Sequence, residues 1–414
     1  SPPMTRMAKQ LLPLFFAVLL LQALCAGGWT LRVTQDSLAY KALAADWWGE
    51  YFSDRSHIWP PLFPLLLSFF PENGLELGAF LLQAFGISMG VYLHWQLARR
   101  YLGQETNISY VFLFLLLFNT ELSWVGQYFW SEGFFFLLYS LFLFASCREE
   151  EAAPLSSALP PQAAGLAGLS SKRGNSRSPY FWIKLLSGSL MPLQRHSGVF
   201  LLFGSWIYQS SKKGGSPFWG LRWEGLMVLP WLAWALWSGW FSDVREFQEE
   251  YYGKGITADI LRFIGSVGMM GSNLVKGWLP SAFLPETAQY TLGFLLMAAF
   301  GLWISRLTYQ QFKGKDHPIK NVQRLLLLTG YGYLCIHSYI GFSSYMDPLR
   351  FFAVLWPSFT LALLLEFQQQ LRRFAQKGNP RARQAAWLAL GLVVLWVCLR
   401  WARNVYQWNF VLGG

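Results

Sequence analysis

Four charged side chains lie beside long apolar runs, where a charge is costly unless it has a partner or a water-filled cavity. They are Asp36, Glu132, Arg195 and Arg350. A carboxylate can act as general base toward an acceptor hydroxyl, and arginine suits the bidentate recognition of a phosphate leaving group. If the fold brings these groups together, Asp36 is the candidate catalytic base and the other three are candidate substrate-binding residues.

Three further polar residues occur close to these charges in the sequence. Tyr40 follows Asp36 at the spacing of one helical turn, His57 lies later in the same loop, and His196 comes directly after Arg195. We include all three as candidate substrate-binding residues.

Each charge also has a purely structural explanation. Asp36 has the position of a helix N-cap, so its segment could be a capped interfacial helix with Trp47, Trp48 and Trp59 as an aromatic belt. Glu132 could cap the helix that it opens, Arg350 could extend to the membrane surface, and Arg195 could belong to an internal ion pair.

The elements that would position these residues are membrane helices. Of the 414 residues, 54% are hydrophobic and only 13% are charged, whereas about 25% are charged in a soluble domain. We therefore expect an all-α polytopic membrane protein, a single integral membrane domain over 1–414, with ten or eleven transmembrane helices. The apolar runs are 10–29, 75–97, 108–126, 128–147, 181–209, 221–241, 288–307, 325–342, 349–369 and 385–401.

The run 181–209 is interrupted by Gln194, Arg195 and His196. Polar residues in the middle of an apolar run predict a short helix, a turn, and a second short helix that returns to the same face. His94, inside another run, is expected to be a hydrogen-bonded core residue.

Charge in the loops predicts the orientation. With the amino terminus inside, the inner loops hold 21 of the 33 Lys and Arg but 6 of the 22 Asp and Glu, which is the positive-inside pattern. The net charge of +11 therefore requires no nucleic-acid partner. This orientation makes 30–74 a first outer loop with interfacial helices, 242–287 a second outer loop, and 147–179 a flexible cytoplasmic linker. We expect a cell (inner) membrane protein with its active site on the periplasmic face.

Several short motifs follow one another along the chain: Asp36-Ser37-Leu38-Ala39-Tyr40, Trp59-Pro60-Pro61-Leu62-Phe63-Pro64, Leu97-Ala98-Arg99-Arg100, Trp130-Ser131-Glu132-Gly133, Leu193-Gln194-Arg195-His196-Ser197-Gly198, and Arg350 with Pro357. Their order resembles that of the GT-C glycosyltransferases, which use sugars linked to a lipid phosphate. The serine-glutamate and arginine motifs are most similar to the GPI mannosyltransferase II branch. The proline-proline-leucine motif is equally similar to the aminoarabinose and protein O-mannosyl transferases.

This resemblance implies transfer of a hexose such as mannose from a polyprenyl-phosphate donor to a lipid, glycan or protein acceptor, with inversion. By the same resemblance, Asp36 activates the acceptor or helps to bind metal, Arg195 and Arg350 lie near the lipid phosphate, and Glu132 lies near the sugar or acceptor. Thr34 occupies a position where the family often has another acid. A divalent metal is therefore left open, and no cofactor is required by the pattern.

Other functions fit the composition as well. A ligase or polymerase of lipid-linked glycans would use a larger outer loop than 242–287. A transporter would need internal duplication, and no convincing repeat relates the two halves. A non-catalytic subunit of a membrane complex would use the 22 Trp and 35 Phe for packing and lipid contact.

Overall fold

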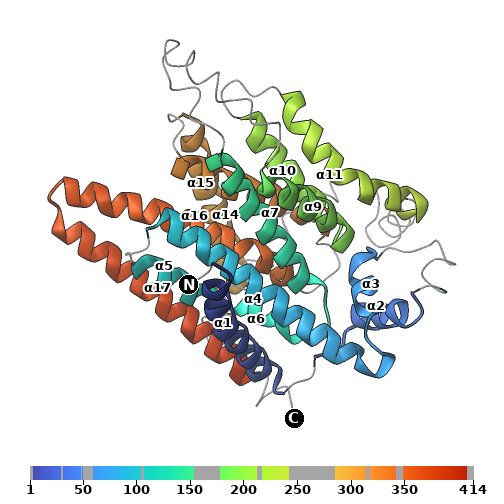
Figure 1. Ribbon diagram of the computed structural model, residues 1–414. Helices are drawn as coiled ribbons and strands as arrows, with labels where there is room; N and C mark the ends of the chain where they lie inside the picture. The colour runs from blue at the N-terminus through green and yellow to red at the C-terminus, as the bar shows by residue number, and fades with distance from the viewer. Residues whose placement is uncertain are drawn as a thin grey trace.

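The computed structural model describes residues 3–28, 31–47, 49, 59–103, 107–152, 178–211, 217–241, 285–313, 318–341 and 348–407. No strand occurs among these residues, which are mostly helical (Figure 1). An isolated parallel bridge joins Arg32 to Tyr128. The predicted candidate His57 lies outside the described residues, as do 242–284 of the second outer loop and 153–177 of the predicted linker.

The described helices follow one another along the whole chain. They are α1 (Pro3–Ala26), α2 (Gln35–Ala45), α3 (Leu62–Leu67), the 3-10 helix η2 (Glu72–Gly74), α4 (Leu75–Tyr101), α5 (Asn107–Leu117), α6 (Thr120–Gln127), α7 (Glu132–Ala152), α9 (Pro179–Gln194), α10 (Gly198–Ser210), α11 (Pro217–Trp237), α14 (Glu286–Lys313), α15 (Pro318–Gly341), α16 (Pro348–Gln376) and α17 (Pro380–Tyr406).

Length and composition identify the membrane helices. Five segments of the described chain are long and apolar enough to cross a bilayer: Met7–Ala26, Glu72–Tyr101, Asn107–Gln127, Thr287–Gln310 and Pro380–Tyr406. The chain is thus an all-α polytopic membrane protein, as the composition predicts. Helices α9 and α10 confirm the predicted interruption of the run 181–209, with the turn at 195–197.

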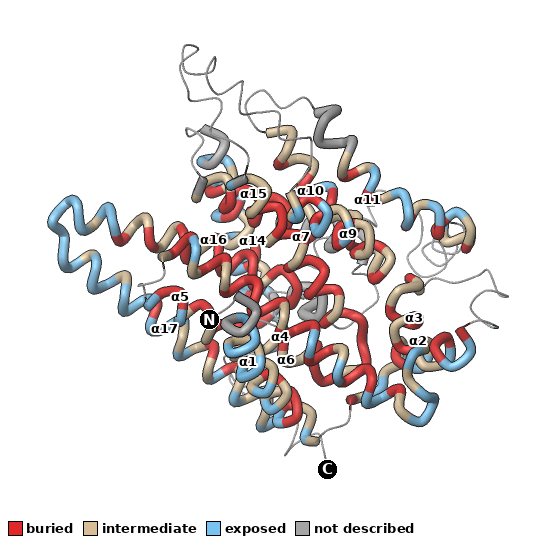
Figure 2. The backbone as a smooth tube through the Cα atoms, in the orientation of Figure 1, coloured by how far each residue is buried: buried red, intermediate tan, exposed pale blue. Residues whose placement is uncertain are grey.

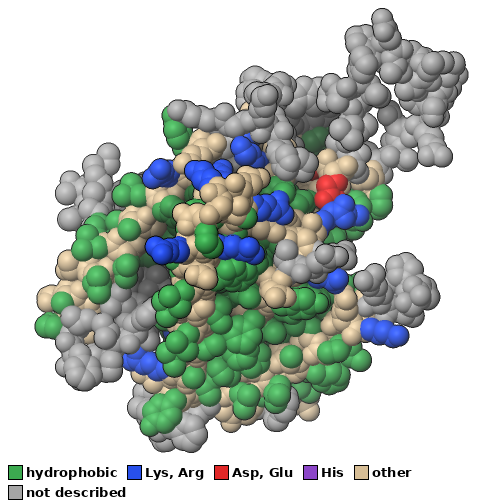
Figure 3. Space-filling view, turned by 90° about the vertical axis from the view of Figure 1, so that its left-hand side faces the viewer, with side chains coloured by type: hydrophobic (Ala, Val, Ile, Leu, Met, Phe, Trp, Pro, Cys, Tyr) green, Lys and Arg blue, Asp and Glu red, His purple; other side chains and the backbone are tan. Residues whose placement is uncertain are grey.

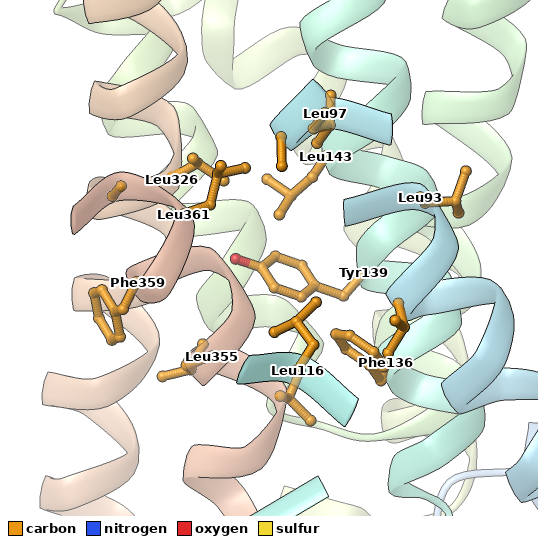
Figure 4. Packing of buried hydrophobic residues seen from close by; sticks show 14 of the residues in the cluster. Leu93, Leu97, Leu116, Phe136, Tyr139, Leu143, Leu326, Leu355, Phe359 and Leu361 are labelled. Carbon is orange, nitrogen blue, oxygen red and sulfur yellow. The ribbon is translucent and has the colours of Figure 1, made fainter. Parts of the chain in front are cut away.

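The centre of the bundle is formed by α4, α7, α15 and α16, while many residues of α1 and α17 are exposed on its outside (Figure 2). The exposed residues of these two helices include the apolar Phe16, Leu20, Leu388 and Leu392. Tyr139 of α7 lies fully buried in the main apolar cluster and extends toward the helix that carries Leu355 and Leu361 (Figure 4). Its hydroxyl lies 3.0 Å from Ser358 Oγ. Ser358 Oγ in turn lies 3.3 Å from Nε2 of His94, so His94 is a hydrogen-bonded core residue, as expected.

The run 108–126 is two helices rather than one. Asn119 has an extended backbone, and its side chain accepts a hydrogen bond of 2.7 Å from the amide of Leu122. An asparagine side chain satisfies an amide at a helix start better than it fits a helix interior. Helix α5 therefore ends at Leu117, and α6 begins at Thr120.

The predicted linker 147–179 is helical at its start, because α7 continues to Ala152. Glu151 forms ion pairs with Arg100 of α4 and with Arg148. Glu149 pairs with Lys184 of α9 across 3.3 Å. These acidic residues hold three helices together at this end of the bundle, so the expectation of a loop is wrong for 147–152.

This end of the bundle is also the basic end. Lys and Arg side chains are spread over the face that carries the α16–α17 turn, where acidic groups are scarce (Figure 3). Arg99 and Arg100 end α4, Arg373 lies in the last turn of α16, and Arg381 and Arg383 begin α17. The predicted cytoplasmic face corresponds to this end, while the orientation itself stays a prediction.

Candidate functional site

Helix α2 is fixed at the opposite end of the bundle by hydrogen bonds to the segment that precedes α7. Its N-cap is Thr34 rather than Asp36, and Ser37 Oγ accepts a bond of 2.9 Å from the Thr34 amide. The fully buried Ser37 hydroxyl donates to the Phe129 carbonyl across 3.0 Å, and Trp130 Nε1 donates to Thr34 Oγ1 across 2.9 Å. Asp36 consequently lies in the first turn of α2, and its side chain is not needed as the cap.

Gln83 of α4 orients the start of α7. Its side chain is buried, with Oε1 accepting from the Gly133 amide at 2.7 Å and Nε2 donating to the Trp130 carbonyl at 2.6 Å. A Cβ atom at Gly133 would lie 2.0 Å from Gln83 Oε1. A larger residue here would therefore force the Gln83 side chain out of its position. Together these contacts set the direction in which Ser131 and Glu132 point.

Ser131 connects the polar side chains of three elements. Its hydroxyl lies 3.2 Å from the hydroxyl of Tyr40 on α2 and accepts a hydrogen bond of 3.1 Å from Nη1 of Arg195. Its carbonyl accepts a bond of 3.0 Å from Nε2 of Gln194. Arg195 also forms an ion pair with Glu132, with 2.6 Å between Nη1 and Oε1. The structure thus places three predicted candidates, Tyr40, Glu132 and Arg195, in one cluster.

Because the two charged side chains of this cluster are largely buried, either would be costly in free energy without its partner. The side chain of Glu132 is 1% exposed and that of Arg195 is 13% exposed. Arg195 follows the last residue of α9, and its backbone is extended rather than helical. The internal ion pair proposed as the structural explanation for Arg195 is therefore present. An ion pair with fixed geometry can also serve a site, because it holds the guanidinium in one position.

Tyr40 links the cluster to the aromatic side chains around α3. Its ring packs against Trp59 and Phe63, with centroids 5.1 and 5.0 Å away. Burial raises the pKa of the Tyr40 hydroxyl, the charge of Arg195 opposes that rise, and Glu132 and Asp36 reinforce it. The partly buried Asp36 therefore lies close enough to act electrostatically on the hydroxyl.

Two described tryptophans of the predicted first outer loop, Trp47 and Trp59, pack against neighbouring side chains. Trp47 is 5% exposed and belongs to a small apolar cluster with Leu43, against which Trp59 and Trp237 pack. The burial of Trp47 speaks against its predicted place in an interfacial aromatic belt, Trp59 is partly buried, and Trp48 lies outside the described residues. The tryptophans form the wall beside α2.

His196 lies beside the cluster, in an aromatic environment. Its Nδ1 accepts a hydrogen bond of 2.9 Å from Trp231 Nε1, and its ring stacks on Trp234 at 5.3 Å and tilts against Trp240 at 4.6 Å. These contacts join the turn after α9 to the end of α11. The position supports a role in fixing the turn that carries Arg195.

The other predictions concern residues whose side chains are not described. Arg350 lies in the first turn of α16, and its side chain lies outside the described part of the structure. Within the described part of the chain, no group of three or more His, Cys, Asp or Glu is arranged to hold a metal ion.

Three residues of the cluster are not among the candidate site residues predicted from the sequence: Ser131, Gln83 and Gln194. Gln83 carried the clearest signal, because an amide in the middle of an apolar run needs partners when it is buried. Ser131 had no such signal, since serine is common at helix starts.

The sequence matches no protein family model and no curated protein. Among solved structures, the fold is similar to that of the archaeal oligosaccharyltransferase AglB from Archaeoglobus fulgidus, determined in complex with an inhibitory peptide and a dolichol-phosphate. The identity is 12%, the TM-score is 0.48, and the match covers 95% of this chain. The chain spans 56% of the length of that structure.

Proposed function

We propose that this chain is a membrane glycosyltransferase that moves a sugar, a hexose such as mannose, from a polyprenyl-phosphate donor to an acceptor hydroxyl. The observation that carries the proposal is the buried Glu132–Arg195 pair, joined through Ser131 to Tyr40. Helix α2, which contributes Tyr40, carries Asp36 one turn earlier. A candidate base and a fixed guanidinium thus lie on adjoining elements at one end of a membrane bundle.

In the proposed reaction, Asp36 takes the proton from the acceptor hydroxyl while that oxygen attacks the anomeric carbon. The bond between this carbon and the phosphate oxygen breaks, and the polyprenyl phosphate leaves with the bonding electrons. Direct displacement inverts the configuration at the anomeric carbon. Asp36 suits this role because its carboxylate is partly exposed and is not needed to cap α2.

Arg195 acts on the leaving group, because the negative charge on the phosphate increases as the bond to the sugar breaks. A cation already held in position stabilises that charge without reorganisation in the transition state. Glu132 supplies the positioning through its ion pair. Arg350, which opens α16, is proposed as a second cation toward the same phosphate.

The membrane setting supports a lipid-linked donor. A prenyl chain can lie between apolar helices while its phosphate stays at the interface. The basic residues at the other end of the bundle favour that end as cytoplasmic, which puts α2 and the cluster on the outer face. Nucleotide sugars are not generally available there, so a polyprenyl-phosphate sugar is the natural donor, with a lipid, glycan or protein as acceptor.

Transfer by the purified full-length chain in proteoliposomes tests the proposal. Polyprenyl-phosphate mannose carrying a radiolabelled sugar is supplied with membrane extract as the source of acceptor, and transfer of the label from the donor to the acceptor is measured. Asp36→Asn should reduce the rate by at least about a hundredfold, the usual contribution of a general base. The matched control is Asp46→Asn, because Asp46 is exposed in the same loop and accepts a hydrogen bond from the Gly49 amide.

Thermal unfolding of both variants separates loss of chemistry from loss of structure. A folded Asp36→Asn variant with the wild-type rate would reject Asp36 as the base. A wild-type protein that consumes no polyprenyl-phosphate sugar, tested with several hexoses, would reject the proposed function.

A further inference from the structure

A large cavity lies away from the candidate site, between α14, α16 and α17. Its volume is about 600 Å³, within the range of about 300–1,000 Å³ typical of ligand sites. Most of its lining is apolar and includes Leu115, Trp356, Leu390, Val393 and Val397. The cavity is thus large enough, and apolar enough, to hold a hydrocarbon chain.

The polar residues of the lining are Arg306, Gln310, Thr360, Glu366 and Gln370. Arg306 and Gln310 lie in the last turns of α14, and Glu366 and Gln370 lie in the C-terminal part of α16. Helix α16 ends at the basic face, so Glu366 and Gln370 lie toward that face, and Arg306 and Gln310 line the same cavity. The cavity therefore has the polarity of a lipid, with a polar end near the membrane surface and an apolar remainder.

The charges at the polar end define the head group. Gln370 Nε2 donates to Glu366 Oε1 across 2.6 Å, which holds the carboxylate in place. Within the described residues, neither Arg306 nor Glu366 forms an ion pair. A guanidinium matches a phosphate, whereas a carboxylate accepts N–H donors and repels a second anion.

We propose that this cavity binds one glycerophospholipid whose head group joins a phosphate to a primary ammonium, as in phosphatidylethanolamine. Arg306 binds the phosphate, and Glu366 accepts hydrogen bonds from the ammonium. Gln310 donates to the phosphate or the ester carbonyls, and an acyl chain lies along Leu390 and Val393. This lipid site is independent of the proposed transferase reaction, because its residues come from the other end of the bundle.

Native mass spectrometry of the full-length chain in detergent tests the proposal. The protein is titrated with phosphatidylethanolamine, phosphatidylglycerol and phosphatidylcholine that carry the same acyl chains. We expect phosphatidylethanolamine to bind about tenfold more tightly than either of the others, and Glu366→Gln to abolish that preference, as loss of a hydrogen bond to a charged group implies. Arg306→Gln should weaken binding of all three lipids about tenfold.

Substitutions at two neighbouring positions of α17 distinguish lipid binding in the cavity from lipid binding elsewhere on the apolar surface. Both residues are exposed, but Val393 lines the cavity and Leu392 is not part of its lining. Val393→Trp should reduce phosphatidylethanolamine binding at least tenfold, and Leu392→Trp should leave it unchanged.

Four results would overturn the proposal. Equal binding of the three lipids to the wild-type chain would show unspecific contact, and so would equal effects of the two tryptophan substitutions. Tighter binding of phosphatidylcholine would indicate recognition of a quaternary ammonium by the tryptophans. Unchanged lipid preference in Glu366→Gln would remove the carboxylate from the site.

Discussion

Glu132 and Arg195 are joined by an ion pair of 2.6 Å in which the carboxylate is almost completely buried. The two residues come from the start of α7 and the end of α9, so the pair closes the bundle at the end where α2 lies. Removing one partner from a buried pair leaves an uncompensated charge. The pair therefore joins the start of α7 to the end of α9 and, in our proposal, also holds the phosphate-binding guanidinium of Arg195 in position.

The first prediction concerns the stability of this pair. Arg195→Gln should lower the free energy of unfolding by about 3–5 kcal/mol, because it leaves the Glu132 carboxylate buried without its cation. Adding Glu132→Gln should recover much of that loss, since the double variant buries no charge. Thermal or denaturant unfolding in detergent measures both variants.

A surface pair supplies the control for that measurement. Lys41 and Glu76 also form an ion pair, but Glu76 is 47% exposed, and exposed pairs contribute about 1 kcal/mol or less. Glu76→Gln should therefore change stability little. If Arg195→Gln costs no more than Glu76→Gln, or if the double variant is as unstable as the single one, the described pairing is wrong.

The second prediction concerns Gly133. Gly133→Ala should destabilise the protein by about 1–3 kcal/mol, because the new methyl group collides with Gln83 Oε1. It should also reduce transfer, since Gln83 orients the segment that carries Ser131. Gly391→Ala is the control, because a Cβ there meets no atom within 4 Å and alanine favours a helix by about 1 kcal/mol. Equal stability of the two variants would contradict the close approach.

The third prediction is a dependence on alkaline pH. Burial raises the folded-state pKa of Tyr40 above its ordinary value of 10.0, so the folded state favours the neutral phenol. The stability that Tyr40 contributes is complete below about pH 10 and is lost as the pH rises toward the folded-state pKa. Tyr40→Phe should cost about 1 kcal/mol at pH 7 through the lost bond to Ser131.

Measuring the unfolding free energies of wild type and Tyr40→Phe over a range of pH tests the direction of this pH dependence. The difference in unfolding free energy should shrink, and then reverse, above pH 10, because phenylalanine has no proton to lose. A difference that is constant from pH 7 to pH 11 would show that the Tyr40 hydroxyl is not buried as described.

Much of the helical bundle was predictable, because a long apolar run in a membrane protein has few structures open to it other than a spanning helix. Arg195 and His196 predicted the turn between α9 and α10, since a bilayer core does not accept them inside one long helix. Asn119 carried a similar signal but was overlooked, because a single capping residue does not change the average polarity of its run. The helical continuation of α7 to Ala152 was missed because its acidic residues find cations only in the folded bundle.

The charged residues of the site were predictable from the sequence, but the hydrogen bonds that join them were not. The positions of Glu132 and Arg195 beside apolar runs indicated that they needed partners, and each turned out to be the partner of the other. Ser131 joins them to Tyr40, yet a serine at a helix start has too many ordinary explanations to be singled out. The N-cap of α2 was misplaced because Thr34 and Asp36 are both good capping residues, and only the contacts with 129–130 favour Thr34.

The most direct test of the central claim is an experimental structure of the full-length chain with polyprenyl phosphate bound. We predict the phosphate within hydrogen-bonding distance, about 3 Å, of the Arg195 guanidinium, with Asp36 facing the adjoining space where the sugar and acceptor meet. A phosphate bound elsewhere, with the Asp36 side chain turned away from Arg195 toward open solvent, would contradict the account.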